Sequence, residues 1–238
     1  MEIFKSGHSQ GIKRSSVRAA SVSQAVLLAA ALQGLATSQV FSDDLVRWQV
    51  DGAMLQFNSR IPYPDDPTST ELIQRDVNEF KLYVMDNPQL EVVSLSGPGG
   101  YGPASISIAE TIMEFGLDTR AFGECLSACT RMFLAGGDRT LAEGASLGFH
   151  RPYVIGEEER NYYLAQRDEQ GWETEFDYVE FIYDVGLTDM LEAVEFMLSR
   201  GVTFEFINQA HSVDGWGMWY PEPMTMFKNG VITEMPFE

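Results

Sequence analysis

The residues whose types and order could carry out covalent chemistry are a serine and a histidine near the middle of the chain, Ser127 and His150. A serine hydroxyl becomes an effective nucleophile only when a neighbouring base removes its proton, and histidine is the side chain that most often does so. After residue 38 the chain has only one other histidine, His211. A base for Ser127 therefore has few candidates, and His150, at the end of a predicted strand, is one of them.

The surroundings of Ser127 have two interpretations. The serine lies between a predicted strand and a predicted helix, where the free N–H of Ala128 could stabilise an oxyanion. The Ser-Gly-Pro-Gly-Gly stretch at 96–100 could also bring free N–H groups close to a ligand. However, serine is equally common as an ordinary helix N-cap, and from the turn alone this structural role is favoured.

Two cysteines, Cys125 and Cys129, flank the serine and are the only cysteines in the chain. Their spacing places the two α-carbons within the span of a disulfide, provided that Cys129 is already helical. They can instead be two small buried apolar side chains, and the sequence leaves both alternatives open. Two cysteines with distant histidines lack the spacing of a metal site, so we expect neither a metal nor a cofactor.

The elements that position these residues alternate between strands and helices, which predicts an α/β domain. Strands are expected at 54–61, 90–95, 117–122, 139–141 and 146–150, and helices at 68–85, 104–116 and 128–135. The acidic segment 157–199 is expected to be mostly helical, with an apolar stripe that packs on the sheet or on a partner subunit. Residues 216–220 and 230–232 are expected to close the domain as two short strands.

The stretch 95–152 resembles the proteolytic subunits of Clp-type proteases and their exported relatives in the Clp-protease/crotonase superfamily. The resemblance rests on Ser-x-Pro-Gly-Gly at 96–100, Gly-x-x-x-Ser-Ala at 123–128, an Ala-Gly…Arg segment at 135–139 and His-x-Pro at 150–152. It implies a domain over 43–238 built of repeated ββα units, with a mostly parallel sheet flanked by helices.

The same resemblance implies a role for each residue of the motifs. It makes Ser127 the nucleophile and His150 its base, and it assigns the oxyanion N–H groups to Gly100 and Ala128. It also implies peptide or protein substrates and makes self-assembly into a homo-oligomer one expected outcome.

The third member of a catalytic triad is the point where this chain departs from the family pattern. Asp214 is the nearest carboxylate to the position where the family has its acid, and Asp184 and Asp189 are rivals. A Ser–His dyad is also compatible with the sequence, with lower activity, because the acid orients the histidine and stabilises its charged form. The alternative to a peptidase is a catalytically silent interaction module of the same fold.

Composition excludes several other classes of protein. The chain has 238 residues, enough for one sizeable core, and a formal net charge of −19. Nucleic-acid binding requires clustered Lys and Arg, so a nucleic-acid partner is not expected. A crotonase-type acyl-CoA enzyme and a partner ATPase are not expected either, because the chain carries an export signal and both coenzyme A and ATP-driven unfolding belong to the cytoplasm.

That signal is predicted in residues 1–38. Four basic residues and one acidic residue precede an apolar run at 25–32, and small residues follow at 34–38, which is the pattern of a secretory signal peptide. We expect a periplasmic or secreted protein, with an uncleaved membrane anchor as the alternative. N-terminal sequencing of protein from a native-like host is expected to show a start between residues 37 and 43. An intact Met1 in a cytoplasmic fraction would contradict the location.

Overall fold

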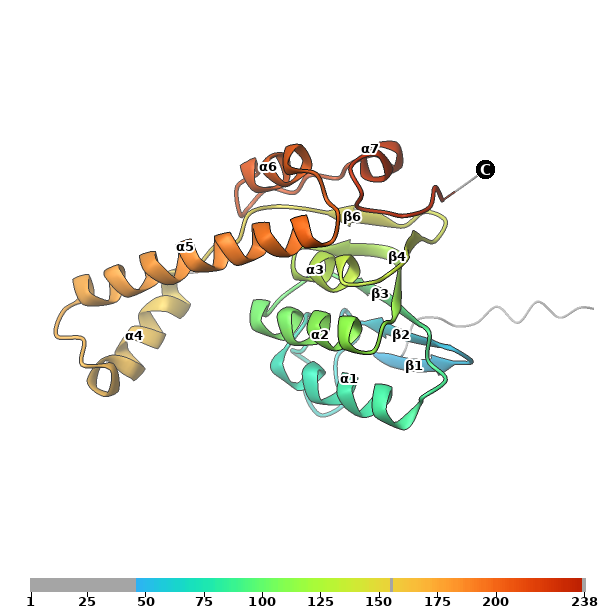
Figure 1. Cartoon of the computed structure of the whole chain (residues 1–238). Coiled ribbons are helices and arrows are strands. Elements are labelled where there is room, and N and C mark those ends of the chain that lie inside the picture. The colour runs from blue at the N-terminus through green and yellow to red at the C-terminus, as the bar shows by residue number, and fades with distance from the viewer. Residues whose placement is uncertain (1–45, 155, 237–238) are drawn as a thin grey trace, which may run out of the picture. The chain divides into compact units, whose positions relative to one another are not determined.

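The structure is a computed structural model that describes residues 46–154 and 156–236, so the expected signal peptide at 1–38 lies outside the described residues. These described residues form one compact unit. In its described part, a six-stranded sheet has the order β1-β2-β3-β4-β5, and β6 pairs with β4 (Figure 1). The strands are β1 (Trp48–Asp51), β2 (Met54–Asn58), β3 (Val92–Gly97), β4 (Asp118–Leu126), β5 (Arg139–Leu141) and β6 (Ser146–Gly148).

Only the β1–β2 pair is antiparallel, and every other pair in this sheet is parallel. The domain is therefore a mixed α/β structure in which a mostly parallel sheet is flanked by helices. The helices are α1 (Gln74–Asp86), α2 (Gly102–Glu114), α3 (Ala128–Leu134), α4 (Gly156–Gln170), α5 (Glu175–Ser199), α6 (Phe204–Ser212) and α7 (Pro223–Lys228). No helix in 46–154 or 156–236 is long and apolar enough to cross a membrane.

The core lies between the sheet and the neighbouring helices α1, α2 and α3 (Figure 1). Strand β3 is buried along most of its length, as expected for a central strand of a parallel sheet. Its Leu95 side chain and the facing helical residues Ile108 and Phe133 are almost completely buried. Because β3 and β4 are parallel, their carboxyl ends lie at the same edge of the sheet.

Several elements differ from the sequence prediction near the N-terminus of the domain. Strand β1 was not predicted, and α1 begins at Gln74 instead of 68. The stretch 68–73 precedes the helix, and the Asp76 carboxylate accepts the N–H of Ile73 at the helix start. Strand β4 continues through 123–126, where a tight turn was expected, because these residues pair with β6.

The C-terminal prediction of two closing strands is wrong. Residues 216–220 lie between helices α6 and α7, and Val231 and Ile232, which follow α7, are buried without being part of a strand. Trp219 keeps a single antiparallel bridge to Phe149. Short apolar runs do not distinguish a strand from a buried loop, and here the tertiary contacts decide.

Helices α4 and α5 do not pack on the sheet along most of their length, and the alternative expectation, packing on a partner subunit, stays a prediction. The two helices pack on each other through aromatic side chains, with the ring centroids of Tyr163 on α4 and Tyr178 on α5 5.6 Å apart. Tyr178 donates a hydrogen bond to Glu159, and burial raises the pKa of this tyrosine above its usual range. The opposite side of α5 presents exposed apolar side chains, namely Phe176, Val179, Tyr183, Leu187 and Leu191.

If the protein self-assembles, this apolar side of α5 is the surface that we expect to be buried, because burial of such side chains drives association. Leu191→Glu is then expected to lower the mass measured by light scattering from that of an oligomer toward that of a monomer. The same change at Leu82 on α1 is the control, since the two side chains are similarly exposed, 65% and 57%. A monomeric wild type, or equal effects of both variants, would contradict this prediction.

Candidate active site

Ser127 is the single residue between β4 and α3, and its backbone conformation is unusual. Its φ is 53° and its ψ is −122°. Among the described residues it is the only non-glycine residue with a positive φ. Such a conformation costs on the order of 1–3 kcal/mol and persists mainly at functional sites, where the surroundings hold it. A strained strand-to-helix turn of this kind exposes a nucleophilic serine in several hydrolases.

The Ser127 hydroxyl does not act as a helix cap. An N-cap serine accepts a hydrogen bond from the second or third N–H of its helix through the side chain. At α3 the N–H and hydroxyl of Thr130 both donate to the carbonyl oxygen of Ser127, at 2.9 and 2.7 Å, and no side-chain cap is present. Ser127 is also partly exposed. Its hydroxyl is therefore available to a substrate.

A disulfide joins Cys125 to Cys129, the two residues on either side of this turn. The sulfur atoms are 2.01 Å apart and the α-carbons 5.2 Å apart. Both side chains are almost completely buried. Of the two alternatives that the sequence left open, the structure has the bonded one. The bond closes a small ring around Ser127.

The glycine-rich loop at 97–100 packs directly against the serine. A β-carbon on Gly99 would lie 2.7 Å from the Ser127 β-carbon and 3.0 Å from the Ala128 nitrogen. Its φ of 102° also favours glycine. Only glycine therefore lets the loop approach this closely.

Backbone hydrogen bonds position the same loop. The N–H of Leu72 donates to the carbonyl oxygen of Gly99 at 2.6 Å, and the N–H of Tyr101 donates to that of Leu72 at 2.8 Å. Within the described residues, the N–H groups of Gly100 and Ala128 donate no hydrogen bond. Both of the amides that the resemblance assigned to an oxyanion hole are therefore free.

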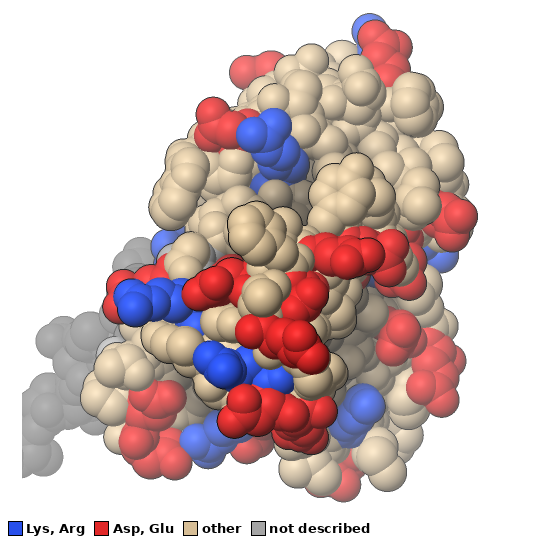
Figure 2. Space-filling view, turned by 90° about the vertical axis from the view of Figure 1, so that its left-hand side faces the viewer, with Lys and Arg blue, Asp and Glu red and all other residues tan. Residues whose placement is uncertain are grey.

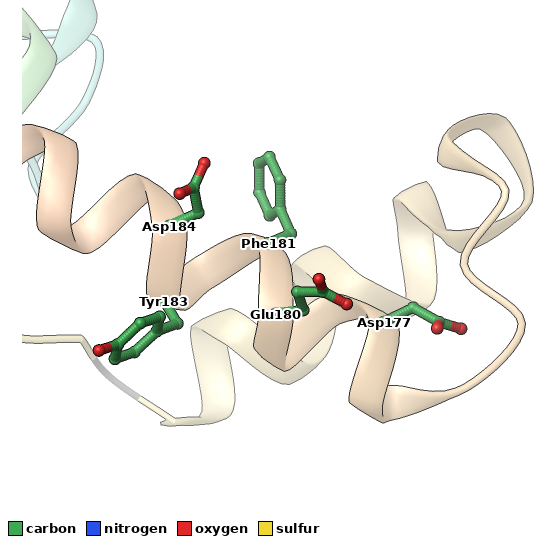
Figure 3. Close-up of a pocket in the computed structure, with 5 residues that line it drawn as sticks. All are labelled: Asp177, Glu180, Phe181, Tyr183 and Asp184. Atoms are coloured by element: carbon green, nitrogen blue, oxygen red, sulfur yellow. The ribbon is translucent and has the colours of Figure 1, made fainter.

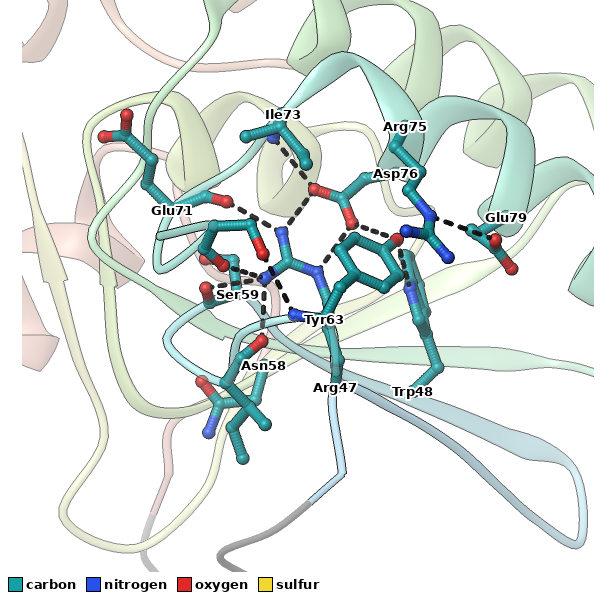
Figure 4. Close-up of polar contacts among 12 residues, drawn as sticks. Arg47, Trp48, Asn58, Ser59, Tyr63, Glu71, Ile73, Arg75, Asp76 and Glu79 are labelled. Carbon is teal, nitrogen blue, oxygen red and sulfur yellow. Dashed lines mark hydrogen bonds and ion pairs between the residues drawn. The ribbon is translucent and has the colours of Figure 1, made fainter. Parts of the chain in front are cut away.

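A buried ion pair holds the segment that leads to Leu72 (Figure 4). The guanidinium of Arg47 donates to both carboxylate oxygens of Asp76, at 2.7 and 2.5 Å. It also donates to four backbone carbonyl oxygens, those of Ser59, Ile61, Ser69 and Glu71. The Tyr63 hydroxyl donates to Asp76 at 2.8 Å, and burial raises the pKa of Tyr63 above its usual range. This cluster could not be predicted from the sequence, because nothing local marks Arg47 as buried.

His150 follows β6, and the pairing of β6 with β4 brings it to the edge of the sheet where Ser127 lies. Leu126 is in register with Gly148, and the Ser127 N–H donates to the Gly148 carbonyl oxygen at 2.9 Å. Ser127 and His150 therefore leave neighbouring parallel strands at the same edge. No hydrogen bond joins the two side chains within the described residues.

The orientation of the His150 ring depends on a backbone carbonyl. Its Nδ1 lies 2.8 Å from the carbonyl oxygen of Arg151. A carbonyl can only accept, so this bond requires a proton on Nδ1 and leaves Nε2 free to act as a base. The backbone next to His150 is held by a second hydrogen bond, in which the N–H of Arg151 donates to the Val213 carbonyl oxygen at 3.0 Å.

Asp214 lies next in sequence to Val213, but its carboxylate serves a turn. Its Oδ1 accepts the N–H groups of Trp216 and Gly217, at 3.0 and 2.8 Å. Within the described residues it makes no hydrogen bond to His150. The rivals Asp184 and Asp189 are exposed on α5.

Arg139, the arginine of the Ala-Gly…Arg segment, has a structural position. It is buried, and its guanidinium donates to the carbonyl oxygens of Gly136, Arg200, Gly230 and Val231. Burial lowers the pKa of this guanidinium. Arg139 therefore ties β5 to the C-terminal segment and does not take part in the site.

The other features of the described surface do not add a site. A hollow on α5 is lined by Asp177, Glu180, Phe181, Tyr183 and Asp184 (Figure 3). The Asp177 carboxylate accepts the N–H of Thr174, and this hydrogen bond lowers its pKa, so it serves the start of α5. Figure 2 shows acidic side chains gathered on one face with Lys and Arg between them. Within 46–154 and 156–236 no three His, Cys, Asp or Glu side chains form a metal-binding group.

Comparisons with known proteins give a distant likeness. No protein-family model matches the chain, and no curated protein matches it. Among solved structures, a ClpP1 mutant from Listeria monocytogenes is similar, with 14% sequence identity and a TM-score of 0.47. The match covers 69% of this chain and 85% of that chain.

Proposed function

We propose that this domain is a serine hydrolase of the Clp-protease/crotonase type, and that it cleaves peptides or proteins through an acyl-enzyme on Ser127. The observation that carries the proposal is the Ser127 turn. Its backbone is strained, its hydroxyl caps nothing, and it lies at the carboxyl edge of a mostly parallel sheet. Strain of this kind without a structural use of the side chain is typical of a nucleophile.

In the proposed reaction the Ser127 oxygen attacks the carbonyl carbon of the scissile bond and its proton passes to Nε2 of His150. The N–H groups of Gly100 and Ala128 stabilise the negative oxygen that forms, and His150 then gives the proton to the leaving amine. A water molecule then attacks the acyl carbon while His150 takes its proton, and His150 returns that proton to Ser127 as the acyl group leaves. The hydrogen bond between the serine and the base is often loose before substrate binds.

We propose the dyad form of this site, in which the Arg151 carbonyl takes the place of a carboxylate. It accepts the Nδ1 proton of His150 and so selects the tautomer that works as a base. Asp214 is engaged by two backbone N–H groups instead. A neutral carbonyl stabilises the charged imidazolium less than a carboxylate does, so we expect a slow enzyme.

The alternative is a catalytically silent binding module, which is favoured by the lack of a hydrogen bond between Ser127 and His150 within the described residues. A fluorophosphonate probe separates the two. We expect it to label wild-type protein, with the added mass on the peptide that contains Ser127. Protein that resists the probe from about pH 6 to about pH 9, a range that extends well above the ordinary pKa of histidine, would favour the binding module.

We also propose that the domain works outside the cytoplasm. The disulfide between Cys125 and Cys129 supports this location, because such bonds persist in oxidising compartments and are rare in reducing ones. The N-terminal sequence of the native protein tests the same point.

A further inference from the structure

We infer that the Cys125–Cys129 disulfide is a positioning element that holds Ser127 in its reactive conformation. The inference rests on the proposed function and concerns the same site. The bond joins the end of β4 to the first turn of α3 across the strained residue. It therefore fixes the separation of the two segments whose geometry sets the φ and ψ of Ser127.

An unstrained conformation of this turn is available to the chain. If Ser127 returned to an extended φ, its hydroxyl could accept the N–H of Thr130, as in an ordinary N-cap. At present that N–H donates to the Ser127 carbonyl oxygen at 2.9 Å. In that unstrained form the Ser127 hydroxyl would be engaged as a helix cap. The site therefore needs a constraint that keeps the turn in its strained conformation.

The remaining contacts of the turn do not supply this constraint. The N–H of Ser127 is bonded to Gly148, which holds the turn to β6. Gly99 packs against it from the loop. Neither contact joins the start of α3 to β4, and the N–H of Ala128 donates to nothing in the described chain. The hydroxyl of Thr119 on β4 does donate to the Phe133 carbonyl oxygen of α3 at 2.6 Å, but this hydrogen bond lies near the far end of the helix. The disulfide is the link that ties the start of the helix to the strand.

Burial of the two cysteines indicates a permanent constraint. Their exposed fractions are 0% and 2%, so a reductant does not reach the sulfur atoms in the folded protein. The same burial means that alanine, which is small and apolar, can replace each cysteine without exposing a polar group.

The test measures the rate of fluorophosphonate labelling of Cys125→Ala, Cys129→Ala and the double variant. Each is expected to react about 10-fold more slowly than wild type at saturating probe, because the strained turn becomes the minor state. The double variant is expected to be no slower than either single variant, since the first substitution already breaks the bond. The probe concentration that gives half the maximal rate is expected to stay unchanged.

The matched control is Ile112→Val, a completely buried position near the C-terminal end of α2, whereas the glycine-rich loop leads into the N-terminal end of that helix. It is expected to lower the unfolding temperature and to leave the labelling rate as in wild type, which separates positioning from stability. If the alanine variants do not fold, wild type reduced by dithiothreitol in mild urea gives the same comparison. The reductant supplies two electrons and two protons, closes to its own cyclic disulfide and leaves two cysteine thiols.

The outcomes distinguish this inference from the proposed function. Wild-type protein that is not labelled at Ser127 would overturn both. Labelling of wild type together with an equal rate in folded, disulfide-free protein would overturn the inference and leave the hydrolase standing. An equal loss of rate in Ile112→Val would assign the effect to stability and overturn the inference as well.

Discussion

Ser127→Ala is expected to abolish turnover of a peptide ester and labelling by a fluorophosphonate, with a loss of roughly 10⁴-fold or more in kcat. The variant removes the atom that forms the acyl-enzyme, and no other hydroxyl occupies the strained turn. His150→Ala is expected to fall to a similar level, because the nucleophile and its base act as a unit. Initial rates of both variants, measured beside wild type, check this result.

The control for this experiment is Asp214→Asn. The asparagine retains the side-chain oxygen that accepts the N–H groups of Trp216 and Gly217, so the turn is expected to survive. We expect kcat to stay within about 10-fold of wild type, since the Arg151 carbonyl still orients His150. An inactive Asp214→Asn variant that remains folded would instead identify Asp214 as the acid of a triad. Active Ser127→Ala protein would remove Ser127 from the mechanism.

Asp76→Ala is expected to lower the free energy of unfolding by about 3–5 kcal/mol, the largest stability effect that we predict. The substitution leaves the Arg47 guanidinium buried without its counter-ion, and it also removes an acceptor from Tyr63 and Ile73. Urea denaturation followed by tryptophan fluorescence measures the change, since Trp48 lies beside this cluster.

The matched control is the exposed ion pair between Asp65, in the loop before α1, and Arg75, in the first turn of α1. Arg75 donates to Asp65 at 2.8 Å, but both side chains are largely exposed to solvent. Asp65→Ala is therefore expected to leave the urea midpoint almost unchanged. If both aspartate variants had equal effects, the buried ion pair would not be the main support of this region. Folded Asp76→Ala protein is also expected to react more slowly with the probe. The Arg47–Asp76 pair holds the segment that leads to Leu72, and Leu72 bonds to Gly99, which packs against Ser127.

The sequence by itself determined the parts of the protein that depend on short-range patterns. The apolar run at 90–95 predicted the buried strand β3, and helical spacing predicted α2 and α3 close to their observed bounds. The order of these elements was enough to place Ser127 at a strand-to-helix turn. It also predicted an α/β domain, whereas the mostly parallel sheet flanked by helices was implied by the family resemblance of the motifs. Each of these features depends on neighbouring residues, whose spacing the sequence displays directly.

Only the tertiary structure decided how distant polar groups pair. Arg47 and Asp76 are 29 positions apart and meet because the loop between them wraps around the guanidinium. The Ser127 turn has a positive φ that serine by itself avoids, and its neighbours Gly99 and Gly148 are distant in the sequence. Whether two such groups pair depends on how far each is removed from water in the folded state and on how separate strands align with one another. Neither quantity is a property of a local stretch of sequence, so neither can be inferred from residue types and spacing.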